Sequence, residues 1–302
     1  MITAVLIAYN NDTHIAEAVQ SALRQTKAFD RIIVVDDGST DQTRPMLREF
    51  AERHDRLDVI FHEENQGPGG ARNTGLDQVT TEYFCFLDGD DVFFDDCCEK
   101  MQKACAEEDA DFWAFNGLAL RENSSNRRIV GRVTSTVLTS LDERQSALNW
   151  VTYPWNKLYR TAFIRQHNIR FPKGRYEDVP WCVACTLSAR KIVGRDEPVV
   201  HYRMHGDSLL KRPSISHIDI LDQWQRATDF TERMFGDAEI VEEERFIHLM
   251  HVVRSGRIPD ARIPDYVDRV LDICGPLPYL RAKLTSKKAS RSVRYIAKKK
   301  WL

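Results

Sequence analysis

Two clusters of acidic residues in this chain have the types and spacing that metal or polar-ligand chemistry needs. The segment Asp88-Gly89-Asp90-Asp91 sets two carboxylates one residue apart, directly after an apolar run. Such a pair supplies oxygen ligands for Mn²⁺ or Mg²⁺, and these cations share their coordination with phosphate oxygens. Because Asp and Gly are also common in turns for local reasons, this segment alone leaves a structural turn as the alternative.

A second acidic pair, Asp36-Asp37, follows another apolar run and precedes Gly38 and Ser39. A carboxylate at this position can accept a hydrogen bond from a nucleobase N–H, while Ser39 caps the next helix. The alternative is a simple capping turn.

Residues 65–75 form a glycine-rich segment that carries Arg72. The segment lacks the Gly-Lys-Ser/Thr ending of a P-loop, and its glycines do not fit the dinucleotide-binding fingerprint. A glycine-rich helix start with an arginine nearby still suits a phosphate or the edge of a nucleobase.

Short apolar runs alternate with helical patterns over the first 90 residues, which is typical of βαβ units and a mostly parallel sheet. We predict strands over 2–8, 31–35, 57–61 and 83–87, and helices over 15–23, 46–51 and 71–79. In such sheets ligands bind outside the carboxyl ends of the strands, where both acidic pairs lie. Further helices are expected over 95–108, near 161–167 and after residue 177, and a strand over 199–203.

Length and composition are those of an ordinary globular protein. The 302 residues allow one large α/β domain with an appendage, or two domains. A content of 42% hydrophobic and 29% charged residues excludes the disordered and low-complexity classes. No apolar run is long enough to cross a bilayer, and Met1 to Tyr9 lacks the features of a signal peptide, so we expect a first strand there. Seven cysteines without an export signal predict a cytoplasmic location.

The end of the chain is strongly basic. Nine cations and no acid follow Asp272, and over 289–301 the apolar positions keep helical spacing. A basic amphipathic helix of this kind lies on anionic bilayers, so we expect peripheral binding to the inner face of the cell membrane; a solvated basic end is the alternative. The remainder is acidic, which argues against binding to nucleic acid.

Four motifs occur in order along the chain: Ala8-Tyr9-Asn10, Asp36-Asp37-Gly38-Ser39, Gly69-Gly70-Ala71-Arg72-Asn73 and Asp88-Gly89-Asp90-Asp91. In this order they resemble family 2 of the GT-A-fold glycosyltransferases. The resemblance is strong over the first 100 residues and continues toward residue 210 through Trp155-Asn156-Lys157-Leu158 and Glu177-Asp178. It implies an α/β fold of GT-A type, with a Rossmann-like, mostly parallel central sheet flanked by helices.

The sequence pattern also predicts a division of the chain near Pro213, beyond which the resemblance gives little help. We expect a GT-A catalytic domain over 1–212, with a donor half over 1–95 and an acceptor half over 96–212. Residues 213–302 are expected to form a helical C-terminal region that ends in the basic amphipathic tail.

The family's donor is a nucleotide sugar, and the matched residues favour a UDP-sugar. The resemblance implies that donor-binding positions are Ala8, Tyr9, Asn10, Asp37, Gly70, Arg72, Asp88, Gly89 and Arg203. It implies Asp90 as the direct ligand of Mn²⁺ or Mg²⁺, with Asp88 and His205 as further candidates. Asp88 would also contact the ribose, and Arg203 would clamp a phosphate.

Asp178 matches the base of an inverting transfer in this family. The acceptor hydroxyl attacks the anomeric carbon from the face opposite the leaving group, so one carboxylate must take its proton. Contacts to the acceptor, a hydroxyl of a cell-surface glycan or of a lipid-linked molecule, are expected from Trp155, Asn156, Lys157, Glu177 and Trp181. For Trp155 a position in the core is the alternative.

Two other functions stay open at this point. A sugar-nucleotide nucleotidyltransferase also needs acids, a metal and a glycine-rich loop, but it expects that loop directly after the first strand, where this chain has Ala8-Tyr9-Asn10-Asn11-Asp12. A non-catalytic module that binds nucleotide sugars would have lost its catalytic acids, whereas Asp88, Asp90 and Asp178 are present.

Overall fold

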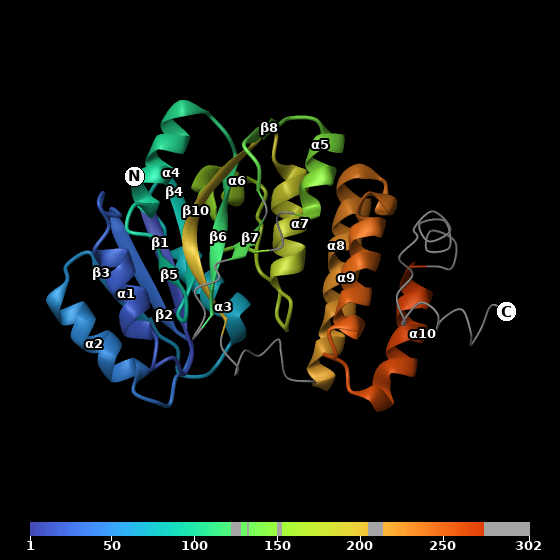
Figure 1. Ribbon diagram of the computed structural model, residues 1–302, viewed down its shortest axis with the longest axis horizontal. Coiled ribbons are helices and arrows are strands. Elements are labelled where there is room, and N and C mark those ends of the chain that lie inside the picture. Colours follow the sequence, from blue (N-terminus) through green and yellow to red (C-terminus); the bar gives the residue numbers. More distant parts are fainter. Residues whose placement is uncertain (122–127, 132, 150–152, 205–213, 275–302) are drawn as a thin grey trace. The chain divides into compact units, whose positions relative to one another are not determined.

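The computed structural model describes residues 1–121, 128–131, 133–149, 153–204 and 214–274 (Figure 1). The chain divides into two compact units, residues 1–205 and 206–302. The strands are β1 (Ile2–Ala8), β2 (Arg31–Asp36), β3 (Leu57–Phe61), β4 (Tyr83–Asp88), β5 (Val92–Phe93), β6 (Phe112–Arg121), β7 (Arg128–Val130), β8 (Thr136–Leu138), β9 (Lys157–Arg160) and β10 (Ile192–Met204). The α-helices are α1 (Ile15–Leu23), α2 (Thr43–Arg53), α3 (Gly67–Asp77), α4 (Cys97–Glu107), α5 (Leu141–Ser146), α6 (Thr161–Gln166), α7 (Asp178–Ser188), α8 (Asp219–Phe235), α9 (Glu242–Arg254) and α10 (Ile263–Cys274).

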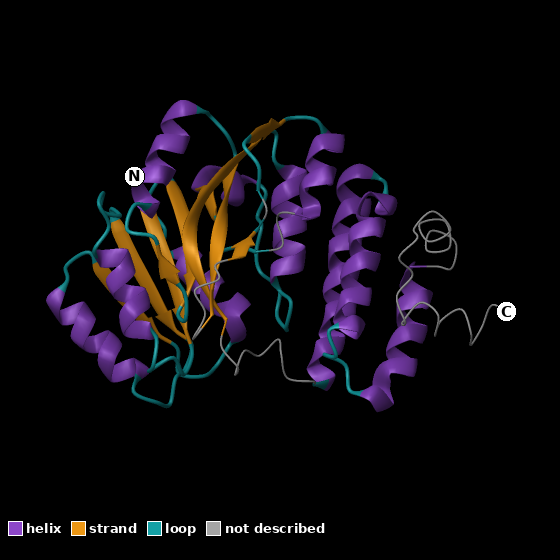
Figure 2. Cartoon of the chain, viewed as in Figure 1, coloured by secondary structure: helices purple, strands orange, loops and turns teal. Residues whose placement is uncertain are grey.

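The strands of the first unit form one sheet in the order β3-β2-β1-β4-β9-β6-β10-β5, with β7 beside β6 and β8 beside β10 (Figure 2). The strands β3, β2, β1 and β4 are parallel, and their register pairs Ala8 with Asp36 and Ile7 with Asp88. The carboxyl ends of β1, β2 and β4 therefore stop at the same edge, so the fold brings both acidic pairs together as the sequence predicted.

Beyond β4 the sheet is mixed. The strand β9 runs antiparallel to β4 and to β6, whereas β6 and β10 are parallel to each other. The last strand is longer than the predicted 199–203, because β10 begins at Ile192 and follows β6 with a register shift near Pro198. The expected α/β sheet flanked by helices is confirmed, but its second half is less parallel than expected.

Helices cover both faces of this sheet (Figure 2). One face of β1 and β2 shares a buried apolar core with side chains of α1, α2 and α4. On the other face Gly75 of α3 lies against Val5, and the Trp181 ring of α7 packs edge-on against Phe86. Each fully buried large apolar side chain contributes about 1.5–3 kcal/mol, so the two layers hold the strand ends rigidly in place.

The second unit is helical in its described part. It contains α8, α9 and α10, and the apolar side chains of Leu221, Trp224 and Leu249 are buried, as their helical spacing predicted. Among the described residues no helix combines the length and the apolar character needed to cross a membrane. The basic tail over 289–301 lies outside the described residues.

Candidate active site

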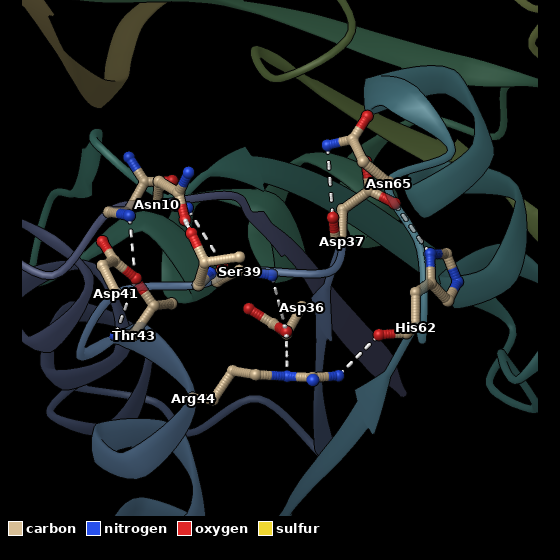
Figure 3. A network of polar contacts seen from close by, with 11 residues as sticks. Asn10, Asp36, Asp37, Ser39, Asp41, Thr43, Arg44, His62 and Asn65 are labelled. Carbon is tan, nitrogen blue, oxygen red and sulfur yellow. Dashed lines mark hydrogen bonds and ion pairs between the residues drawn. The ribbon is translucent and has the colours of Figure 1, made fainter.

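Side-chain hydrogen bonds tie the segment after β1 to the segment after β2 (Figure 3). The backbone N–H of Asn10 donates to Ser39 Oγ at 2.9 Å, and Asn10 Oδ1 accepts from the backbone N–H of Thr40 at 2.9 Å. Asn10 has a φ of 50°, a left-handed conformation that Asn tolerates better than most residues. Asn10 is therefore a link between the two loops, while the preceding Tyr9 side chain is 47% exposed.

The two carboxylates of the pair after β2 have different surroundings (Figure 3). Asp36 is fully buried and forms an ion pair with Arg44, 2.8 Å from Oδ2 to Nε, so it stabilises the start of α2. Asp37 is held from two sides. Its backbone N–H donates to Ala8 O at 2.8 Å, and its Oδ1 accepts from the backbone N–H of Gln66 at 2.9 Å. Asp37 is thus fixed at the meeting point of three loops.

The glycine-rich segment is helical from Gly67 onward, four residues earlier than predicted. A Cβ on Gly70 would lie 2.7 Å from Gln66 Cβ, so glycine is required where the first turn folds over this side chain. Arg72 is consequently in the second turn, and its guanidinium is buried. It donates to Glu177 Oε1 at 2.6 Å and to Asp88 Oδ1 at 2.7 Å, and it lies over the Phe171 ring.

The surroundings of Arg72 favour its charged form. Burial alone lowers the pKa of Arg72, but the neighbouring Asp88 and Glu177 carboxylates raise it above its ordinary value. Arg72 was predicted to lie near the base or the diphosphate of the donor. The structure places it beneath the acidic loop, where it joins Asp88 of β4 to the residue before α7.

The acidic loop after β4 presents two of its three carboxylates. The Asp88 side chain is 29% exposed and Asp90 is partly exposed, whereas Asp91 is buried. A Cβ on Gly89 would lie 2.8 Å from Ile7 O, so only glycine lets the loop pass this close to β1. Burial raises the pKa of Asp91, and the nearby Asp90 and Asp88 carboxylates raise it further. Asp91 therefore favours its protonated form, and Asp88 and Asp90 are the carboxylates that the loop presents.

This loop fits a divalent cation that is held in part by a bound diphosphate. Among the described residues, no three His, Cys, Asp or Glu side chains are grouped so that they alone could hold a metal ion. Mg²⁺ commonly binds through one or two carboxylates plus substrate phosphates, and Asp88 and Asp90 supply such a pair. Asp91 Oδ2 is buried and has no hydrogen-bond partner among the described residues, and the raised pKa of Asp91 favours the form that keeps its proton.

Asp178 begins α7 and directly follows Glu177, which forms an ion pair with Arg72. The preceding Tyr176 has a φ of 64°, which a bulky aromatic residue adopts only under strain. Asp178 Oδ1 is buried and has no hydrogen-bond partner within the part of the chain that the structure describes, although the residue as a whole is partly exposed. Burial raises the pKa of Asp178 to about 7, with a further increase from Glu177, while Arg72 acts in the opposite direction. A carboxylate with this pKa is suited to take a proton near neutral pH.

Arg203 lies beside the acidic loop, with a role different from the predicted phosphate clamp. Its backbone N–H donates to Asp91 Oδ1 at 2.7 Å, and its Nε donates to Asp90 O at 2.9 Å. Its Nη2 donates to Glu17 of α1 at 2.5 Å. These contacts use the guanidinium to hold the acidic loop against α1 and β10. The predicted ligand His205 lies outside the described residues.

All five residues expected to contact the acceptor are buried. Trp155 is 3% exposed and stacks on Tyr202, with ring centroids 5.4 Å apart. Trp181 is fully buried and stacks on Phe171. Asn156 donates to a backbone carbonyl of β6 at 2.6 Å and accepts from Lys157 Nζ at 2.8 Å, and both are buried. Burial corrects the expected acceptor contacts of the two tryptophans, Asn156 and Lys157, and the structure gives these four packing roles. Glu177 is also buried and forms an ion pair with Arg72.

Three residues that the sequence analysis did not single out contribute to the site. His62 contacts Asp37 from the end of β3, with 2.7 Å between Nδ1 and Oδ1, and Thr74 of α3 contacts the same ring. Tyr176 sets the backbone before the Glu177-Asp178 pair. A polar residue directly after an apolar strand was a signal that could have identified His62. Nothing in the local sequence distinguishes Tyr176.

Comparison with known proteins identifies relatives of this chain. A family model described as "Glycosyl transferase family 2" matches residues 3–169. "Putative glycosyltransferase EpsH" of Bacillus subtilis (strain 168) is 30% identical over 224 residues, which are 70% of this chain and 63% of the relative. "Uncharacterized glycosyltransferase EpsJ" of the same organism is 28% identical over 223 residues, 70% of this chain and 64% of the relative. The match thus spans less than two thirds of either relative's own length.

Solved structures share the fold. S. aureus TarS 1–349 in complex with UDP-GlcNAc is 21% identical, with a TM-score of 0.76 over 90% of this chain and 80% of that chain. The mannosyltransferase PcManGT from Pyrobaculum calidifontis, in complex with GDP-Man and Mn²⁺, is 16% identical, with a TM-score of 0.57 over 98% of this chain and 83% of that chain. At these identities the likeness concerns the architecture.

Proposed function

Because the chain belongs to glycosyl transferase family 2 and shares its GT-A architecture with solved structures, we propose that it is an inverting, metal-dependent glycosyltransferase. It moves one sugar from a nucleotide donor, a UDP-sugar, to a hydroxyl of a cell-surface glycan or of a lipid-linked acceptor. The observation that carries this proposal is the continuous series Asp88, Arg72, Glu177 and Asp178, which connects the acidic loop to a carboxylate with a pKa of about 7.

The donor is proposed to lie along the edge where β1, β2 and β4 end. Asp37 accepts the N–H of the uracil ring, and the exposed Tyr9 side chain supplies a flat apolar surface for the base. Glycines at positions 70 and 89 let the backbone that lines this edge pack closely on Gln66 and on β1. TarS was solved with UDP-GlcNAc and with UDP, which supports a uridine donor for this chain.

In the proposed reaction Asp178 acts as the base. It takes the proton of the acceptor hydroxyl while that oxygen bonds to the anomeric carbon, and the bond from this carbon to the diphosphate oxygen breaks. The nucleoside diphosphate leaves on the opposite face, so the configuration inverts. Mn²⁺ or Mg²⁺ bound by Asp88 and Asp90 would neutralise the negative charge that grows on the diphosphate. Arg72 holds Asp88 in place, and its positive charge balances the charge of the Glu177 carboxylate next to the base.

Nucleotide binding to the full chain tests the donor assignment without an acceptor. UDP at 100 times its Kd, with Mn²⁺, is expected to stabilise the native state by about 2.7 kcal/mol, which raises Tm by several degrees. Without Mn²⁺ the increase in Tm is expected to be smaller, because no cation then offsets the repulsion between the diphosphate and the carboxylates of the acidic loop. Thermal shift with UDP, GDP, CDP and dTDP, each with and without Mn²⁺, measures this.

The panel also separates the alternatives. A shift with GDP and none with UDP would keep the enzyme class but overturn the uridine assignment. No shift with any nucleoside diphosphate or nucleotide sugar would contradict the donor site as a whole. Asp90→Asn is the matched variant, since it is expected to lose the Mn²⁺-dependent part of the shift while it preserves the size of the side chain.

We further propose that the protein is cytoplasmic and binds the inner face of the cell membrane through its basic end. The cations after Asp272 flank apolar residues such as Ile296 and Trp301, and each cation near an anionic surface contributes about 1 kcal/mol. The full chain is expected to float with vesicles that contain phosphatidylglycerol. A chain ending at Pro278 is expected to stay unbound. Equal flotation of the two, or equal flotation with neutral vesicles, would contradict the proposal.

A further inference from the structure

A buried polar chain runs from the end of β3 to α3 and passes through Asp37. The imidazole of His62, 7% exposed, places Nδ1 2.7 Å from Asp37 Oδ1 and Nε2 3.0 Å from Thr74 Oγ1. The backbone of His62 is also fixed, because its N–H donates to Asp36 O at 2.9 Å and its carbonyl accepts from Arg44 Nη2 at 2.5 Å. The ring therefore has little freedom to move (Figure 3).

The direction of these hydrogen bonds follows from the groups involved. An ionised carboxylate only accepts, so His62 Nδ1 carries a proton and donates to Asp37. In the neutral ring Nε2 then accepts, and the Thr74 hydroxyl donates to it. Asp37 Oδ1 thus receives two hydrogen bonds, one from His62 and one from the backbone N–H of Gln66.

The second carboxylate oxygen of Asp37, Oδ2, has different surroundings from Oδ1. Asp37 Oδ2 makes no hydrogen bond within the part of the chain that the structure describes, and the side chain keeps 4% of its surface exposed. Since two donors hold Oδ1, the carboxylate cannot rotate without breaking both hydrogen bonds. Oδ2 is left as an acceptor with a fixed direction.

We propose that His62, anchored by Thr74, is a positioning residue that locks the Asp37 carboxylate and thereby sets which nucleobase the donor site accepts. The proposal rests on the proposed function, in which Asp37 meets the base. A base that offers a ring N–H, such as uracil, donates to Oδ2. Cytosine presents a lone pair at the equivalent ring nitrogen, so a fixed carboxylate repels it, whereas a carboxylate that can turn away rejects it less.

Substitution of His62 separates this role from simple packing. His62→Phe keeps a flat ring but removes the donor, so Kd for UDP with Mn²⁺ is expected to rise about tenfold, the effect of one lost hydrogen bond to a charged group. The preference for UDP over CDP falls with it. His62→Asn keeps an N–H donor near the position of Nδ1 and is expected to recover most of the preference. Thr74→Val removes the hydrogen bond to Nε2 on the far side of the ring. Its preference for UDP over CDP is expected to lie between those of His62→Phe and His62→Asn.

Isothermal titration of the full chain with UDP and CDP in Mn²⁺ measures both quantities, and pyrophosphate with Mn²⁺ reports on the phosphate subsite alone. Pyrophosphate binding is expected to be equal in all variants. His54→Phe, a histidine at the end of α2 that stacks on Phe50, is the matched control. A lower Tm in His62→Phe with an unchanged UDP-to-CDP ratio would overturn the inference and leave a structural role. Failure of the unsubstituted chain to bind UDP would instead contradict the proposed function.

Discussion

Replacing Asp178 with Asn is expected to lower kcat by about 10²- to 10⁴-fold, the range that a positioned general base contributes. Asn preserves the size of the side chain at the start of α7, but it cannot take the proton of an acceptor hydroxyl. Binding of UDP with Mn²⁺ is expected to survive, because Asp37, Asp88 and Asp90 remain. Initial rates with a UDP-sugar, together with the thermal shift by UDP, measure the two effects separately.

The pH dependence of the unsubstituted enzyme follows from the surroundings of Asp178. Burial and the neighbouring Glu177 raise the pKa of Asp178 to about 7, and only the ionised form is a base. The rate is therefore expected to rise with pH up to about 7 and to level off above it. Asp178→Asn is expected to lack this rise in its residual rate. A rate profile that is flat from pH 5 to pH 8 in the unsubstituted enzyme would contradict Asp178 as the base.

The same raised pKa means that Asp178 lowers the free energy of unfolding at neutral pH. An unfolded Asp loses its proton near its ordinary pKa of 3.8, whereas folded Asp178 keeps it until about pH 7. The folded state binds more protons in this window, so the free energy of unfolding falls as pH rises from 4 to 7 and stays low above it. Asp178→Asn is expected to melt above the unsubstituted chain at pH 8 and level with it at pH 4.

Asp77→Asn is the matched control for both measurements. Asp77 is an exposed residue of α3 that pairs with Arg170 at the surface, and such pairs contribute little to stability. Its substitution is expected to leave both kcat and Tm unchanged. An unchanged kcat in Asp178→Asn would remove the base assignment, while loss of the UDP shift in that variant would mean that the substitution disturbs the donor site.

The first four strands could be predicted from the sequence because their signal is local. Each is a run of mostly apolar residues, either β-branched or aromatic in large part, between polar turns, and each predicted range agrees with the structure within one residue. Parallel strands in register end at the same edge of the sheet. The sequence therefore also predicted that the two acidic pairs, each at the carboxyl end of a strand, lie close together. The start of α3 was missed because glycines read as a loop, although Pro68 is suited to the first turn of a helix.

The partners of long side chains could not be predicted in the same way. Arg203 contacts Glu17, 186 residues away in the sequence, and Arg72 contacts Glu177, 105 residues away. Both contacts depend on how distant elements meet, and no local pattern records that. Trp155 posed a similar ambiguity, because an aromatic residue suits a sugar or a core equally well, and only its stacking on Tyr202 decides between them.

Arg72→Met is expected to be the most disruptive substitution for the fold and one of the most disruptive for the reaction. It leaves the Glu177 carboxylate buried without its cation, and the loss of one partner from a buried ion pair costs about 3–5 kcal/mol. It also releases Asp88 from the guanidinium that fixes it. Chemical denaturation measures the first effect, and titration of UDP with Mn²⁺ measures the second.

A double substitution distinguishes the structural from the functional part of this loss. In Arg72→Met combined with Glu177→Leu the buried charge is gone, so much of the stability is expected to return, as it does when apolar residues replace a buried ion pair. Activity is not expected to return, because Asp88 still lacks its partner. Activity that recovers together with stability would mean that Arg72 serves only the fold.

The charge of Arg72 also acts on the base. Arg72 lowers the pKa of Asp178 against the effects of burial and Glu177, which raise it to about 7. Arg72→Met is therefore expected to move the rise in rate to higher pH, whereas Arg72→Met with Glu177→Leu removes both influences and is expected to move it less. Arg72→Lys retains a charge but cannot bridge two carboxylates as the planar guanidinium does, so it is expected to keep the pH profile and lose affinity for UDP. If the three variants shared one pH profile, the link between the acidic loop and the base would be steric and not electrostatic.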